Sequence, residues 1–330
     1  MTGARVSWLN GGAALLALAT SIGAAALAGH RTATTATTTA TPAKTTTTTG
    51  GAENPATVTD ASGRRTTVRP FRRIAAGSTV ADRLLLDLAE PQRIVALTEF
   101  GQRHSLAGYR YGDRPLIKSL DDTESLLALK ADLLLVNNYG DQARVARLRE
   151  SGLAVFDLGE MRGIATLLPN IRAVAALLGD SSRGAAYERA LLRRLDSVAA
   201  PLLGKKRRRA MYVSIYGDRL FGGTSGTNYH DILAFAGLDD VAATARFQGW
   251  PQYGAEELLA LDPPLIVTKP GMRRLLCAQP ELDRLRACVA ADGFVEIAGA
   301  LLDDPGPAML DAAEAVFAAA YPGVNQAARP

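Results

Sequence analysis

The sequence has few of the side chains that build protein metal centres. Among 330 residues there are three histidines, His30, His104 and His230, and two cysteines, Cys277 and Cys288. A structural zinc site needs about four such ligands at close spacing. These five residues are scattered along the chain, which argues against a histidine-rich metal site or a zinc cluster.

An excess of charge is also nearly absent from most of the chain. The formal net charge is +4, from 37 basic and 33 acidic residues. Residues 1–50 hold three of the bases, Arg5, Arg31 and Lys44, and no acid. The remainder is therefore almost neutral, which argues against a nucleic-acid-binding protein. Apolar residues make up 48% of the chain, which excludes a wholly disordered or collagen-like protein.

Residues 1–28 are predicted to be a secretory signal peptide. Residues 11–29 carry no charge, and they include the small-x-small motif Ala26-Leu27-Ala28 that signal peptidase recognises. The alternative is an uncleaved membrane anchor, because an uncharged run of this length can just span a bilayer. Residues 29–56 are rich in Thr and Ala, and such a tract cannot bury a core. They are predicted to form a disordered linker.

From residue 57 onward, short apolar runs alternate with helical patterns. A hairpin is predicted over 58–68, with Ser62-Gly63 near its turn. Strands are predicted at 73–76, 93–97, 133–137, 154–158, 210–216, 265–268 and 294–297, and helices at 80–89, 123–130, 141–150, 228–236, 255–260, 281–289 and 308–320. This alternation predicts an α/β fold with doubly wound parallel sheets.

A long helical stretch, 164–200, separates the strands into two groups. It has a break at Gly179-Asp180. Its second part is long enough to join two lobes, although the break is equally compatible with a helix–helix turn inside one lobe. The predicted organisation is an N-terminal lobe at 57–165, connecting helices at 166–204 and a C-terminal lobe at 205–330.

One segment recurs in both groups. Residues 124–135 are similar to residues 256–267, at a constant offset of 132. Each copy reads as a short helix that begins with an acid, Glu124 or Glu256, and runs into a buried strand. Chance similarity between Leu/Ala-rich segments is the alternative. The matched acid and matched position favour two related lobes.

Taken together, these features resemble the bacterial periplasmic solute-binding proteins for ferric siderophores, haem and cobalamin. The resemblance covers roughly residues 57–320 and rests on the order and spacing of several weak motifs: the opening hairpin, 73–75, 90–96, 124–135, 148–155, 222–226 and 229–238. It implies two doubly wound lobes joined by a single long helix, with the ligand held between them and only small closure motions.

The resemblance also implies one surface carboxylate on each lobe that docks against arginines of a membrane permease. Glu124 and Glu256 stand at those positions, and the adjacent Glu257 could replace Glu256. Two such points would set the docking register and speed the encounter. The simpler reading is that each acid only opposes a helix dipole, which is compatible with docking.

Ligands of doubly wound sheets bind beyond the carboxyl ends of the strands. The loops predicted there offer aromatic rings and hydrogen-bonding groups, which suit a large flat or chelated ligand. The predicted ligand-binding residues are Ser78, Thr79, Glu99, Phe100, Tyr109, Tyr139, Tyr216, Arg246, Trp250 and Lys269. For each aromatic residue, packing in the core is the alternative.

The same loops also contain charged side chains and side chains that can ligate a metal. The cations expected to meet ligand carboxylates are Arg110, Arg246 and Lys269. The side chains able to reach the iron of a haem are Tyr109, Tyr111, Tyr139 and His104. A siderophore arrives with its metal already saturated and needs no protein ligand, so no resident metal site is predicted.

Two further motifs have structural interpretations. Cys277 and Cys288 are predicted to form a disulfide, because an isolated pair outside the cytoplasm is usually oxidised; two buried free thiols are the alternative. The basic run 205–209 is interpreted as a solvated connection rather than a nucleic-acid site. The glycine-rich segment 222–226 lacks the lysine of a phosphate-binding loop.

The resulting functional prediction is a binding protein and not an enzyme, since no catalytic constellation stands out. It would work in the periplasm or otherwise outside the cytoplasm, as a monomer and without a cofactor. It would deliver a metal chelate to an ABC importer by docking on the permease dimer, and it would bind no nucleic acid. The alternatives are the same scaffold with another small solute, or an exported two-lobe α/β enzyme.

Overall fold

The computed structural model describes residues 56–138 and 141–324. The predicted signal peptide, nearly all of the predicted linker and Tyr139 lie outside these residues. From Asn54 onward the chain forms one compact unit. Within the described part, no helix combines the length and apolarity needed to cross a membrane.

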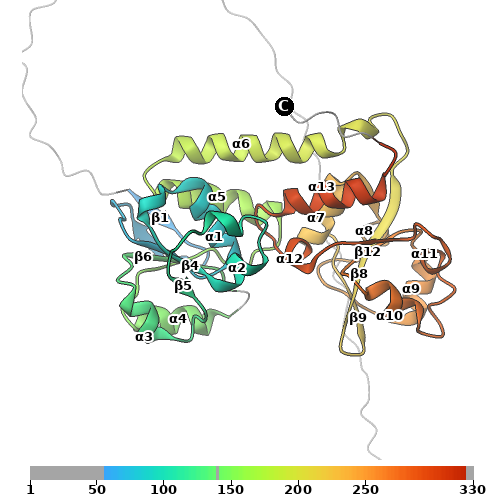
Figure 1. The fold of residues 1–330 in the computed structure, drawn as a ribbon, viewed down its shortest axis with the longest axis horizontal. Helices are drawn as coiled ribbons and strands as arrows, with labels where there is room; N and C mark the ends of the chain where they lie inside the picture. The colour runs from blue at the N-terminus through green and yellow to red at the C-terminus, as the bar shows by residue number, and fades with distance from the viewer. Residues whose placement is uncertain (1–55, 139–140, 325–330) are drawn as a thin grey trace, which may run out of the picture. The chain divides into compact units, whose positions relative to one another are not determined.

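The first lobe, at the left of Figure 1, is built on a five-stranded parallel sheet. Its strand order is β5-β4-β3-β6-β7. Its strands are β3 (Ile74–Ala76), β4 (Ile94–Thr98), β5 (Leu116–Ile117), β6 (Leu133–Val136) and β7 (Val155–Asp157). Its helices are α1 (Thr79–Leu88), α2 (Glu99–His104), α3 (Thr123–Ala128) and α4 (Gln142–Glu150), with the short 3-10 helices η1 (Pro91–Arg93) and η2 (Gly108–Arg110).

The second lobe carries a mixed sheet with strand order β11-β9-β8-β12-β13 and β10 paired to β8. Its strands are β8 (Arg208–Tyr216), β9 (Arg219–Gly222), β10 (Leu238–Asp240), β11 (Gln252–Tyr253), β12 (Ile266–Thr268) and β13 (Phe294–Glu296). β12 and β13 join the parallel part as predicted, and β10, which was not predicted, joins it as well. β9 is antiparallel, because the two-residue turn Gly217-Asp218 folds the chain straight back onto β8.

Two helices connect the lobes. Helix α5 (Ile164–Leu177) ends before Gly179, which has φ +83°, and α6 (Ser181–Val198) begins after Asp180, whose carboxylate accepts from the Arg183 backbone N–H at 2.9 Å. Helix α6 packs along α5, against α1 of the first lobe and against two helices of the second lobe, α7 (Asn228–Phe235) and α13 (Met309–Ala320). Two α/β lobes joined by a long helix are thus confirmed.

The remaining helices of the second lobe are short: α8 (Val241–Thr244), α9 (Ala255–Leu261), α10 (Met272–Cys277), α11 (Arg286–Val289) and α12 (Gly299–Leu302), with η3 (Ala200–Leu202) just before the lobe. The helix predicted over 281–289 is correct only for its last turn. The Cys277–Cys288 disulfide is present, with an S–S distance of 2.01 Å, and it closes this irregular segment into a loop.

The buried apolar side chains form three cores, because alternate residues of a strand point to opposite faces of its sheet. In β6, Leu133 and Leu135 join one core, while Leu134 and Val136 join another on the opposite face of the sheet. β8 splits its side chains in the same way. The largest core contains residues of both lobes and of α1, α5, α6, α7 and α13. The lobes are therefore held by one shared apolar core, and each also has a core of its own.

The opening hairpin, β1 (Thr57–Thr59) and β2 (Arg65–Thr67), is antiparallel as predicted. Its turn is organised by Asp60, whose side chain is fully buried and accepts from the backbone N–H groups of Ser62 and Arg64. Arg149 of α4 forms a salt bridge with Asp60 at 2.5 Å. The hairpin is therefore attached to the outer side of the first lobe.

Candidate functional site

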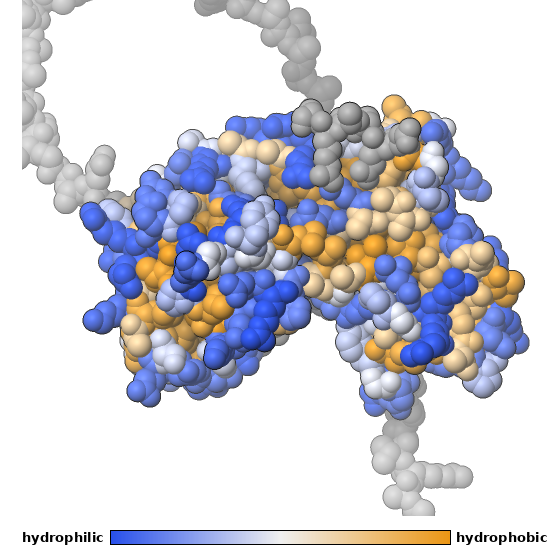
Figure 2. All heavy atoms as spheres, in the orientation of Figure 1, coloured by the Kyte–Doolittle hydropathy of each residue, from blue (hydrophilic) through white to orange (hydrophobic). Residues whose placement is uncertain are grey.

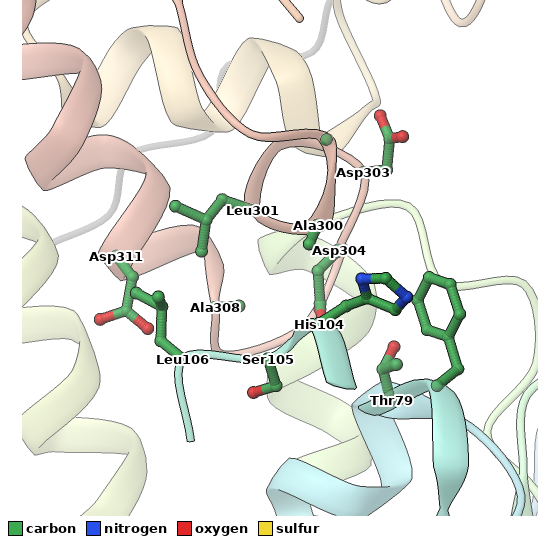
Figure 3. A pocket seen from close by; sticks show the side chains of 12 residues that line it. Thr79, His104, Ser105, Leu106, Ala300, Leu301, Asp303, Asp304, Ala308 and Asp311 are labelled. Atoms are coloured by element: carbon green, nitrogen blue, oxygen red, sulfur yellow. The ribbon is translucent and has the colours of Figure 1, made fainter. Parts of the chain in front are cut away.

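A cavity of about 430 Å³ lies between the two lobes (Figure 3). The first lobe contributes the start of α1 and the α2 segment, and the second lobe contributes α12 and the start of α13. Figure 2 shows apolar surface in this region. The lining residues are Thr79, Phe100, His104, Ser105, Leu106, Gly299, Ala300, Leu301, Asp303, Asp304, Ala308 and Asp311.

Large apolar side chains are left exposed at this cavity. Phe100 is 61% exposed and Leu106 is 63% exposed. The imidazole of His104 lies against the ring of Phe100, with the ring centroids 4.5 Å apart. Clustered exposed apolar groups of this kind mark surfaces that become covered by a ligand or partner. The cavity can thus hold a ligand with an extended apolar face.

The position of Phe100 and His104 depends on a buried polar cluster beneath α2. Thr98 caps the helix, since its hydroxyl accepts from the Gly101 N–H at 3.0 Å. Its own N–H donates to Asp82 at 2.9 Å, and the Tyr111 hydroxyl donates to the same carboxyl group at 2.8 Å. Burial raises the pKa of Asp82 to about 7, against the opposing effect of these bonds.

Gly101 is required for this close packing. A Cβ atom there would lie 2.2 Å from the Tyr111 hydroxyl and 2.3 Å from the Asp82 carboxylate. Tyr111, one of the side chains considered for haem iron, is only 1% exposed, and its hydroxyl is used by Asp82. It therefore supports α2 from below rather than facing the cavity.

Two carboxylates of the second lobe reach helix starts on the other side of the junction. Asp304 accepts from the Gly306 N–H at 2.7 Å and from the Thr79 hydroxyl at the start of α1. Burial raises its pKa to about 6. Asp231 of α7 accepts from the Ile164 N–H at the start of α5, at 2.7 Å. Both contacts place a negative charge at the positive end of a helix dipole.

At the second-lobe rim of the cavity, the positive charge of Lys269 is paired with a carboxylate. The Lys269 ammonium lies 2.6 Å from the Asp303 carboxylate and 2.5 Å from the Tyr216 hydroxyl. Burial alone would lower the pKa of Lys269, but these two partners outweigh it and the pKa is raised. Tyr229 donates to Asp303 at 2.8 Å and stacks on Tyr212. A ligand carboxylate would have to compete with Asp303 for this ammonium.

A smaller cavity of about 200 Å³ adjoins the first, since both are lined by Thr79 and Phe100. It lies beyond the carboxyl ends of β3, β4 and β5 and is also lined by Ser78 and Lys118. The structure therefore brings together Ser78, Thr79 and Phe100 from the predicted set. It also places Lys269 and Tyr216 near the larger cavity. Lys269 pairs with Asp303, which lines that cavity, and donates to the Tyr216 hydroxyl.

Other predicted ligand-binding residues lie elsewhere. Tyr109 is 86% exposed and lines neither cavity. Glu99 is paired with Arg103 at 2.9 Å, and Arg246 is exposed. Trp250 is 42% exposed, and the Arg162 guanidinium lies 5.0 Å from its ring centroid. Arg110, expected to meet a ligand carboxylate, is instead held by Asp87 at 2.6 Å and by the Leu86 carbonyl.

Sequence reasoning missed the loop that follows β13, which supplies half of the larger cavity. Leu301, Asp303, Asp304 and Asp311 all come from this segment. The rule that ligands lie beyond strand carboxyl ends applies to β13 as well. If applied to the loop after β13, this rule would have added Asp303 and Asp304 to the predicted ligand-binding residues. Within the described residues, no group of three or more His, Cys, Asp or Glu side chains is arranged to hold a metal ion.

Glu124 and Glu256 occupy matching places in the two lobes. Each stands in the first turn of its helix, α3 or α9, and each helix leads into a strand that pairs with the lobe's first parallel strand. Both side chains are exposed. Because a helix that leads directly into a parallel strand runs opposite to it, both helix starts lie toward the carboxyl edges of their sheets.

The model of the periplasmic binding protein family matches residues 74–287, which is well over half of the chain. The chain belongs to this family. No curated protein sequence matches it.

Among solved structures, the chain is similar to a possible iron-binding periplasmic solute-binding protein from Staphylococcus epidermidis, with a TM-score of 0.66 and 12% identity over 77% of this chain and 100% of that one. It is similar to the haem-binding protein RhuT from Roseiflexus, with a TM-score of 0.63 and 18% identity over 76% and 99%. A haem-binding protein from Pseudomonas aeruginosa matches with a TM-score of 0.61 and 23% identity over 77% and 94%. These similarities confirm the two-lobe fold.

Proposed function

We propose that the protein is an extracytoplasmic substrate-binding protein that delivers a metal chelate, namely a ferric siderophore, haem or cobalamin, to an ABC importer. The observation that carries the proposal is the cavity of about 430 Å³ between the lobes, with its exposed Phe100–His104 pair. Small-molecule sites have volumes of roughly 300–1,000 Å³ and mostly apolar walls. The similar structures from S. epidermidis, Roseiflexus and P. aeruginosa are described as binding iron or haem, which supports this class of cargo.

The side chains of the cavity separate the candidate chelates. A haem has a flat apolar ring that can stack on Phe100, and its iron has an axial position that the His104 imidazole can fill. In cyanocobalamin, cyanide and the nucleotide base already occupy both axial positions of the cobalt. A ferric siderophore has its metal saturated and would use Phe100 without His104. Loss of the imidazole should therefore affect the binding of these cargo classes differently.

The test is a titration of residues 54–330, the compact unit, with haemin, cyanocobalamin and ferric siderophores, followed by calorimetry and by Trp250 fluorescence. Trp250 is the only tryptophan in that segment. We expect one ligand to saturate, and Phe100→Ala to weaken it about tenfold or more, since burial of a large apolar side chain contributes roughly 1.5–3 kcal/mol. Tyr109→Ala is the matched control, because Tyr109 is an exposed aromatic outside both cavities. Equal losses in both variants would contradict the proposed site.

His104→Ala extends the same titration to the metal. For haem, we expect this variant to shift the absorption spectrum of the complex and to weaken binding. For a siderophore, we expect no spectral change. An unchanged haem spectrum would exclude His104 as a ligand of the cargo metal.

We further propose that Glu124 and Glu256 dock on the permease. Their exposure, their matching places and their position toward the carboxyl edges of the two sheets support this role. Replacing both by Arg should abolish uptake and leave ligand affinity unchanged, because neither residue lines a cavity. The control is Glu150→Arg with Glu281→Arg, which reverses one exposed acid in each lobe. Equal loss of uptake in the control would show a general charge effect instead.

A further inference from the structure

The amino edge of the first sheet carries arginines at the entrances to three strands. Arg69, Arg72 and Arg73 precede β3, Arg93 precedes β4, and Arg114 precedes β5. Because these strands are parallel, their entrances lie at one edge of the sheet, opposite the edge that carries the ligand cavities. We call these five residues the amino-edge arginines.

Most amino-edge arginines are held by main-chain carbonyls rather than by carboxylates. Arg73 donates to the carbonyls of Leu129 and Lys130, which follow α3. Arg93 donates to the carbonyls of Phe71 and Leu178, the latter at the end of α5.

The same holds for the other members of the set. Arg69 donates to the Asp132 carbonyl, and Arg114 donates to four carbonyls, including those of Pro91 and Ile94. Among the described residues, none of the five forms an ion pair with a carboxylate. Carbonyls orient a guanidinium, but each supplies only a partial charge, so the full positive charge of the set remains.

Two of the carboxylates near these arginines accept from neutral donors. Asp132 accepts from the backbone N–H groups of Arg72 and Arg73, at 2.7 and 3.0 Å. Glu90 accepts from the side-chain amide of Gln92 at 3.2 Å. The chain thus fixes five positive charges at one edge beside the negative charges of Asp132, Glu90 and the exposed Asp113.

A groove of about 620 Å³ runs through this set. Arg69, Arg72 and Arg93 line it, together with Phe71, over whose ring the Arg69 guanidinium lies at 4.6 Å. The side chain of Arg72 is exposed and has no bonded partner among the described residues. The groove is therefore basic, open and separate from the ligand cavities.

We propose that the amino edge of the first sheet is a docking surface for anionic phospholipid headgroups. The charges are spread over the entrances of three strands, so a single small anion reaches only part of the set, whereas an array of headgroup phosphates can meet all of it. The chain also enters the lobe here. The Ala56 carbonyl accepts from the N–H of Val68, which lines the groove, and Ala56 follows the predicted linker and export segment. Because this edge is opposite to the one that carries Glu124 and Glu256, lipid binding and docking on the permease would be separate, alternating states.

The experiment measures partitioning of residues 54–330 onto vesicles of equal parts phosphatidylglycerol and phosphatidylcholine, by sedimentation at low and high salt. We expect binding that salt weakens, and a loss of about thirtyfold for Arg69→Gln with Arg72→Gln, since each arginine near an anionic surface contributes roughly fivefold. The control is Arg189→Gln with Arg193→Gln on α6, which removes the same charge from two exposed arginines that form no ion pair with any described residue. Arg72→Glu alone is a second variant that removes no side-chain bond.

Four results would overturn the proposal: no binding to the mixed vesicles, equal binding to pure phosphatidylcholine, equal losses in the α6 control, or retention on soluble heparin without binding to vesicles. The last result would assign the surface to a soluble polyanion. None of these measurements involves the metal chelate, so the outcome is independent of the proposed transport function.

Discussion

Asp82 should make the protein less stable as the pH rises toward neutrality. Its side chain is completely buried, and that burial raises its pKa from 3.8 to about 7, with a further contribution from the charge of Asp304. A raised pKa means that the folded state holds the proton more tightly than the unfolded chain. The stabilisation is therefore complete below pH 3.8 and is lost as the pH rises through about 7. Roughly three pKa units correspond to about 4 kcal/mol.

The assay is urea unfolding of residues 54–330 between pH 5 and pH 8, for the native chain and for Asp82→Asn. Titrating groups that do not interact with Asp82 contribute equally to both proteins, so the difference in unfolding free energy at each pH reports Asp82 together with its neighbour Asp304. Between pH 5 and the folded pKa of about 7 there are roughly two pKa units, so we expect the native chain to lose about 2.7 kcal/mol relative to the variant over this range. Asp304→Asn should reduce that loss, because it removes the repulsion that helps to raise the pKa of Asp82. Parallel stability curves for the native chain and Asp82→Asn would refute the reasoning.

Three further changes test the packing and the crosslink. Gly101→Ala should lower stability by about 2 kcal/mol or more, since its methyl group meets two buried oxygens; an unchanged melting temperature would contradict this. Cys277→Ser with Cys288→Ser should cost about 3 kcal/mol by freeing the loop in the unfolded chain, and urea midpoints that coincide would show otherwise. Asp231→Ala removes the acceptor of the Ile164 N–H and should cost about 1 kcal/mol, with faster hydrogen exchange at that amide; unaltered exchange there would count against this contact.

The fold was largely predictable because its main strands are buried on both faces. A run such as Leu133–Val136 is apolar at every position, since alternate side chains enter two different cores. The short strands β5, β10 and β11, of two or three residues each, were not predicted. They are too short to show a period, and pairing with a neighbouring strand defines them.

Only the first-lobe side of the candidate site was predictable from the sequence. Ser78, Thr79 and Phe100 follow strands directly, so the rule of strand carboxyl ends finds them. The pairing of charges was not predictable, because partners come from distant segments. Arg110 is bound by Asp87, 23 residues earlier in the chain, and Lys269 by Asp303 on a different loop. Residue type alone suggested free cations, whereas the fold had already given each of them a carboxylate.

The attachment of the opening hairpin has a mechanical consequence. If residues 29–56 serve as the predicted linker, a force applied through the linker reaches the folded part of the chain at β1. The Asp60–Arg149 bridge and the bond from the Ala61 N–H to the Asp157 carbonyl transfer that load to α4 and to the edge strand β7. The packing of β1 on α5 and the short segment from β2 into the central strand β3 share this load, so tension along the chain would be spread over the first lobe and the connecting helix.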